Sequence, residues 1–120
     1  MGHQVDWSDV DEVLELLNGI EGIRSADVEV AKVKTPGVWL QIGGYTFDRH
    51  AGHTINARLV LLVGDKNPLR AAKALVDLLN LVLTKVTPSG PVTARTVVTP
   101  EAPGGLPGLV VPLDVLTVPS

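Results

Sequence analysis

Hydrophobic positions are densest between Ile55 and about Val86, where the pattern predicts a long apolar strand, a short loop and the longest helix. Asn67 is a favourable N-cap residue, and Pro68 suits the first turn of a helix. On a helical wheel the apolar residues fill an arc of roughly 240° at the 100° step per residue. The polar residues form one narrow stripe of Arg70, Lys73, Asp77, Asn80 and Thr84.

A helix this apolar requires more cover than one sheet supplies, because a helix lying on a sheet needs an apolar stripe only about 100° wide. The pattern therefore predicts that the protein surrounds the helix on several sides or that a partner covers part of it. We expect the surplus flank to meet the N-terminal helix or a neighbouring subunit. Its residues are Ala71, Ala74, Leu78 and Leu81.

The strand before this helix is predicted over Thr54–Val63. Apolar and polar residues alternate at its start, but Val60 and Leu62 make its second half apolar on both sides. This change predicts a central strand that is covered on both faces near the helix.

Residues 6–18 have the spacing of an amphipathic helix, with Asp6 and Ser8 as alternative N-caps and Asn18-Gly19 at the end. Its acidic residues lie near the positive end of the helix dipole. We interpret them as a solvated face rather than as a site for a metal or a basic partner. They are Asp6, Asp9, Asp11, Glu12 and Glu15.

The next segment has the pattern of a hairpin. Residues 27–34 alternate, residues 35–37 are a turn signal, and residues 38–42 alternate again. Gly43-Gly44 then breaks the strand or makes a bulge, and residues 45–48 are a short extended piece.

The C-terminal third predicts two more strands. Residues 92–99 alternate, and residues 109–118 form the last strand. Between them, residues 100–108 contain three prolines and three glycines, which predicts a long loop. Pro112 cannot donate to a strand ladder, so the last strand is predicted at a sheet edge.

These elements follow the order α-β-β-(β)-β-α-β-β. Mostly short connections favour a largely antiparallel sheet packed with two helices, with a mixed sheet as the alternative. The prediction is one α+β domain over residues 1–120.

Composition narrows the partners. The net charge of −3 and the pI near 5.5 provide no electrostatic footprint for nucleic acid. No apolar run reaches the roughly 18 residues of a membrane span, and the acidic start lacks a signal-peptide core. The chain has no cysteine. We expect a soluble protein made in a cytoplasm.

The best chemical cluster is Asp48, His50 and His53, whose carboxylate and imidazoles could bind a metal. A third or fourth ligand is not evident, so a solvated turn over residues 49–53 is the favoured interpretation. The chain has no phosphate-binding glycine loop, nucleophile elbow or zinc-protease motif. No cofactor and no catalytic residue are predicted.

Aromatic residues make up only 3% of the chain, so the position of each one helps to locate a core or an interface. Trp39 lies on the strand face opposite Val38 and Leu40, where it fills a second core layer or anchors an interface. Arg58 and Arg95 are interpreted as residues of a solvated strand face, with pairing to the acidic helix of another subunit as the alternative.

Several segments together resemble tail terminator (tail completion) proteins of long-tailed bacteriophages, especially those of actinobacteria. The segments are GVWLQI, TINARLVLLV, NPLRAAKALVDLLNLVL, GPVTARTVV and LVVPLDV, within residues 8–118. The resemblance rests on the order of the predicted elements and on the general residue pattern of these segments. It implies a small α+β subunit of a homo-hexameric ring without an active site. Such a ring caps the head-proximal end of the tail tube, ends tube polymerisation and contributes to head–tail joining.

The resemblance implies three partners: further copies of the chain, the tail tube protein and the head–tail connector protein. It implies a structural protein of the virion tail, assembled in the host cytoplasm. We expect the subunit contacts to involve Trp39, the region 43–53 and the region 100–108. The candidate interface residues are Trp39, Tyr45, Arg49, His50, Arg58, Leu81, Leu106 and Pro112.

Three other functions remain open from the sequence. The first is another head–tail connector or neck protein. The second is a small metal-binding enzyme that uses Asp48, His50 and His53. The third is a bacterial α+β interaction module.

Overall fold

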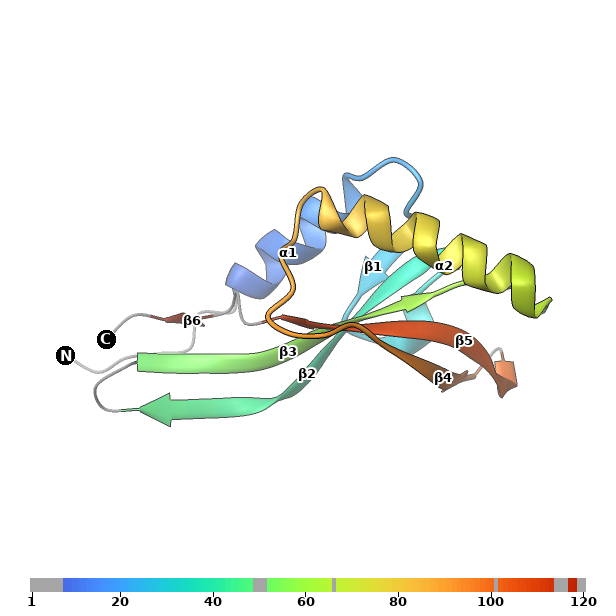
Figure 1. Ribbon diagram of the computed structural model, residues 1–120. Coiled ribbons are helices and arrows are strands. Elements are labelled where there is room, and N and C mark those ends of the chain that lie inside the picture. Colours follow the sequence, from blue (N-terminus) through green and yellow to red (C-terminus); the bar gives the residue numbers. More distant parts are fainter. Residues whose placement is uncertain (1–7, 49–51, 66, 101, 114–116, 119–120) are drawn as a thin grey trace.

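In the computed structural model of the chain, two helices lie on one face of a twisted six-stranded sheet (Figure 1). The structure describes residues 8–48, 52–65, 67–100, 102–113 and 117–118, and for residues 8–9, 43–48, 52–56 and 117–118 it describes the backbone alone. The elements are α1 (Ser8–Asn18), β1 (Ser25–Asp27), a 3₁₀ turn η1 (Val30–Lys32), β2 (Gly37–Asp48), β3 (Gly52–Leu62), α2 (Pro68–Leu83), β4 (Thr93–Thr99), β5 (Ala102–Leu113) and β6 (Thr117–Val118).

The strands are ordered β1-β2-β3-β5-β4, and β6 pairs with the start of β3. β1 runs parallel to β2, whereas all other pairs are antiparallel. The predicted α+β fold with two helices on a mixed, mostly antiparallel sheet is therefore confirmed.

Strand β3 is buried on both faces, as its sequence predicts. Leu59 and Leu61 pack towards the helices in the main core, with Leu78 of α2. Val60 and Leu62 belong to a second cluster on the opposite face. That cluster also contains Val33 and Val97, with Val30, Trp39, Leu106 and Val110 packed against it.

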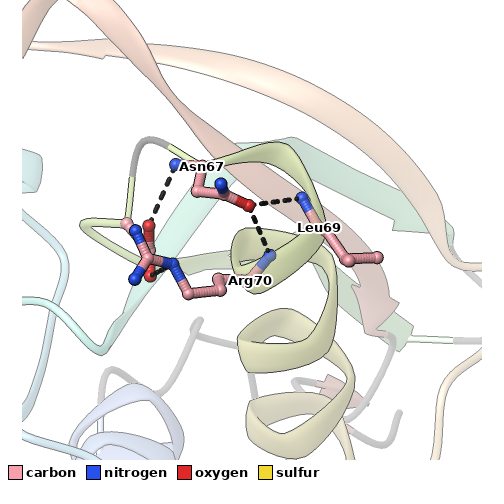
Figure 2. Close-up of polar contacts among 4 residues, drawn as sticks. Asn67, Leu69 and Arg70 are labelled. Carbon is pink, nitrogen blue, oxygen red and sulfur yellow. Dashed lines mark hydrogen bonds and ion pairs between the residues drawn. The ribbon is translucent and has the colours of Figure 1, made fainter.

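The N-terminus of α2 is built as the sequence predicts (Figure 2). The side-chain oxygen of Asn67 accepts hydrogen bonds from the backbone N–H groups of Leu69 and Arg70, both at 3.1 Å. Asp65 accepts a bond from the N–H of Asn67 at 2.9 Å and lies 3.4 Å from Nε of Arg70. This cap fixes the residue at which α2 begins after the loop that follows β3. Helix α1 begins at Ser8, and Asp6 lies outside the described residues.

The predicted strand over residues 27–34 is wrong, and so is its hairpin with residues 38–42. β1 ends at Asp27 and pairs parallel with β2. Local side-chain bonds end the strand: the carboxylate of Asp27 accepts from the N–H of Glu29 at 3.0 Å, and Oγ of Ser25 accepts from the N–H of Lys34 at 2.7 Å. Such bonds compete with a strand ladder and turn the chain into η1.

The glycine pair Gly43-Gly44 makes a bulge and does not end the strand. The register with β3 shifts between Ile42 and Gly44, and pairing continues to Asp48 opposite Gly52. β2 and β3 thus form one long hairpin whose distal part extends beyond β1, β4 and β5 and is paired with β6 at the start of β3 (Figure 1). We call residues 43–48 and 52–56 the arm. The molecule is correspondingly elongated, at 53 × 28 × 24 Å.

The predicted loop over residues 100–108 is also wrong, because β5 already begins at Ala102 and pairs with β4. Glycines serve this strand where space is short. Gly105 has φ +92°, and a Cβ on Gly108 would lie 3.0 Å from the carbonyl oxygen of Leu61 and 3.2 Å from that of Arg95. The absence of a side chain at residue 108 lets β5 pass closely between β3 and β4 without displacing either backbone.

The predicted edge position of Pro112 is wrong, because β5 lies between β3 and β4. The carbonyl of Pro112 accepts a bond from the N–H of Ser89 at 3.0 Å, so its pair with Arg58 on β3 is not hydrogen-bonded. An N–H at residue 112 would point to the β4 side of β5. β4 starts at Thr93 opposite Val110, so no β4 residue lies opposite Pro112 to accept a bond from it. A central strand tolerates proline at such a position.

Candidate assembly surface

The two edges of the sheet differ in how they end. At the β1 edge, the side-chain amide of Asn18 donates to the carbonyl of Ala26 at 3.0 Å and accepts from its N–H at 2.8 Å. The amide occupies the hydrogen-bonding groups that β1 would offer to a further strand. The C-terminal end of α1 thus closes this edge.

The β4 edge is open among the described residues. β4 pairs with β5 on one side, and residues 93–96 are exposed. Val98 near its end is 67% exposed. Such an edge presents unpaired backbone donors and acceptors to another strand. Successive residues of β5 direct their backbone groups alternately to β4 and to β3, and the carbonyl of Pro112 points to the β4 side. Pro107 therefore points to β3, and its pair with Thr96 is not hydrogen-bonded. The N–H and C=O of Thr96 consequently point outward from the sheet.

Beside this edge, α2 has an apolar flank that the described elements cover only in part. Leu69 is 81% exposed, Val76 52% and Leu83 41%. Together with exposed Ala72 and half-buried Leu79, they recur at alternating steps of three and four residues. That spacing places them on one side of the helix. We call these five residues the α2 flank.

The position of this flank differs from the predicted surplus. Ala71 and Leu78 are buried in the main core, and Ala74 and Leu81 are half-buried on its other side. Leu81 lies against Gly22 (φ +101°), where an added Cβ would come within 2.7 Å of its Cδ1. The prediction that α2 has too much apolar surface for the sheet alone is confirmed, but most of the uncovered surface is at other residues. Leu81 as an interface residue stays a prediction.

A groove of about 300 Å³ separates α2 from the last two strands. It is lined by Leu75, Ala94, Arg95, Thr96, Pro107 and Gly108. The groove arises because α2 packs mainly on β3 and β5, and Ala94 and Thr96 of β4 remain exposed. Leu75 thus joins the groove and the β4 edge to the α2 flank, because Ala72 and Leu79 lie three and four residues from it on the helix.

Trp39 and Leu106 lie on the other face of the sheet. Both are half-buried against the second cluster, and Nε1 of Trp39 donates to the carbonyl of Val28 at 3.0 Å. Trp39 thus fills the second core layer, one of the two predicted roles. Leu106 also lines a pocket of about 220 Å³ with Val33, Thr35, Leu62, Gly64, Thr99 and Ala102.

The two strand arginines share this second face. Arg58 alternates with buried Val60, and Arg95 alternates with buried Val97. Both are exposed, whereas α1 lies on the opposite face (Figure 1). Asp11, Glu12 and Glu15 of α1 are exposed. Pairing between the arginines and α1 of another subunit stays a prediction.

The remaining candidates fall in or next to the arm. Tyr45 pairs with Ile55 along the backbone, and Arg49 and His50 lie outside the described residues. Asp48 and His53 lie near the arm's tip, opposite Gly52 and Phe47. Among the described residues, no group of three His, Asp or Glu could hold a metal ion.

The chain was compared with protein-family models, curated proteins and solved structures, and none of the three comparisons found a match. Within the described residues, neither helix is long and apolar enough to cross a membrane.

Proposed function

We propose that this chain is a non-enzymatic structural subunit of a bacteriophage tail, a tail terminator that assembles head-to-tail into a ring. The ring caps the head-proximal end of the tail tube, ends its polymerisation and joins the tube to the head connector. Its partners are further copies of the chain, the tail tube protein and a connector protein, and a hexamer is the expected size.

One observation carries this proposal: the surface is asymmetric in the way that a cyclic assembly needs. Among the described residues, an apolar flank with exposed Leu69, Val76 and Leu83 and an open strand edge lie on one side of the molecule, whereas the β1 edge is closed. A contact between two different patches closes into a ring when the rotation between copies is right. The extended arm supplies a second, different patch on the same molecule (Figure 1).

The test is the molar mass of the purified chain over a concentration series, followed by electron microscopy with tail tubes. We expect one defined ring, bound only at the head-proximal end of tubes. Protein located at the portal of empty heads would instead favour another neck protein. A chain that stays monomeric at all concentrations and leaves tube ends bare would refute the proposal.

A further inference from the structure

We propose that the arm of one copy adds as an extra strand to the β4 edge of the next copy. The occupant of the groove beside α2 is then the distal part of β2 from a second copy of this chain. This inference rests on the proposed head-to-tail ring and specifies which two patches form its contact.

Strand directions make this pairing possible without turning a copy over. Along the order β1-β2-β3-β5-β4, the strands from β2 onward alternate in direction, so β4 runs opposite to β2. A second copy placed beside β4 in the same orientation therefore presents its β2 antiparallel to β4. The helices of both copies remain on the same side of the continued sheet.

Both strands have free edges for this contact. β1 covers β2 only opposite residues 37–39, and the described strands leave the outer edge of β2 unpaired from residue 40 to residue 48. β4 offers seven residues, 93–99. The two edges are similar in length, and β4 has the outward-pointing N–H and C=O of Thr96 to begin a ladder.

The residue types of the arm match the groove. Positions 45 and 47 share the helix-side face with Ile55 by backbone register, and they carry the chain's single Tyr and single Phe. The groove between Leu75 of α2 and the last two strands lies on that same face of β4. Aromatic side chains provide the large apolar area that such a pocket takes up. The neighbouring positions 95 on β4 and 48 on the arm belong to the other face of the sheet, and they carry Arg95 and Asp48.

One register satisfies both conditions. If Asp48 lies opposite Arg95 of the next copy, Phe47 lies opposite Thr96, which lines the groove. Tyr45 then lies opposite the exposed Val98. Because Arg95 directs its own N–H and C=O towards β5, its pair with Asp48 is not hydrogen-bonded, and Cα atoms in such pairs are about 4.5 Å apart. A disulfide spans that distance.

The absence of cysteine from the chain makes this register directly testable. The double variant Arg95→Cys with Asp48→Cys is assembled and oxidised, and the products are separated under non-reducing denaturing conditions. We expect a ladder of cross-linked multiples up to the ring size. The matched control, Arg24→Cys with Asp48→Cys, places the first cysteine on an exposed loop at the closed side and should give no ladder.

Two further measurements use the same contact. Phe47→Ser should weaken self-association by about tenfold or more, as loss of a central aromatic contact does, with circular dichroism confirming the fold. Arg95→Glu and Asp48→Arg should each weaken association by a few fold, and the double exchange should restore it.

The outcomes separate this inference from the proposed ring. Assemblies of ring mass without a ladder would overturn the arm contact and leave the ring intact. Cross-linked dimers from Arg95→Cys alone would also overturn it, because β4 would then pair with β4. A monomer at every concentration that binds no tube end would overturn the ring itself, and the arm contact with it.

Discussion

The β1 edge and the β4 edge end the same sheet by opposite means. At β1, a helix folds back and its last residue, Asn18, bonds both backbone groups of Ala26. At β4, no described element covers the edge, and the neighbouring helix exposes Leu69, Val76 and Leu83. The difference shows that this fold closes one edge with its own helix, whereas the described residues leave the other edge uncovered. The proposed head-to-tail assembly needs such an asymmetry.

The largest expected effect comes from breaking the packing that holds the closed edge. Leu17 of α1 is fully buried in the main core, so Leu17→Ala should lower the free energy of unfolding by about 2–5 kcal/mol. Its neighbour Leu16 is 42% exposed, and Leu16→Ala is the matched control, with a loss below about 1 kcal/mol. Denaturant unfolding measures both. Equal losses would contradict the burial of α1 against the sheet.

The two flanks of α2 should respond differently to a charge. Leu81 is half-buried against the loop at Gly22, so Leu81→Asp should destabilise the monomer by about 1–3 kcal/mol. Val76 is 52% exposed, so Val76→Asp should change stability by no more than about 0.5 kcal/mol and still prevent assembly. Thermal unfolding and molar mass measured together test this. A Val76→Asp variant that assembles normally would remove the α2 flank from the interface.

The amide of Asn18 should matter through the edge that it occupies. Asn18→Ala leaves the N–H and C=O of Ala26 without these partners, at a cost of about 1–3 kcal/mol. We also expect faster hydrogen exchange at the Ala26 amide. Asn80→Ala, an exposed asparagine of α2, is the control. Unchanged exchange at Ala26 would mean that Asn18 does not close the edge.

The smallest expected effect is at the N-terminal cap of α2. Asn67→Ala removes two hydrogen bonds to the first turn of α2 and should cost about 1 kcal/mol. Asn67→Asp preserves the accepting oxygen and should retain most of the stability. Chemical denaturation of the two variants gives the comparison, and similar losses in both would mean that the cap bond contributes little.

Sequence alone determined the elements whose signals are local. The cap at Asn67, the apolar excess of α2 and the two-sided burial of β3 follow from spacing within a few turns or strand residues. The α+β class follows from their order. The sequence predicted that α2 has a surplus apolar flank, but it assigned most of that flank to the wrong residues. The reason is that the position of the sheet decides which side of such an apolar helix is buried.

Tertiary structure decided the features that depend on neighbours distant in sequence. Residues 100–108 have the composition of a loop, yet β5 passes there because Gly108 fits between the backbones of β3 and β4. Pro112 predicted an edge strand, but β5 lies inside the sheet. The proline is tolerated there because β4 pairs with β5 only as far as Val110, two residues before Pro112. Whether an edge is closed, as Asn18 closes β1, depends on a contact across eight residues that no periodic pattern encodes.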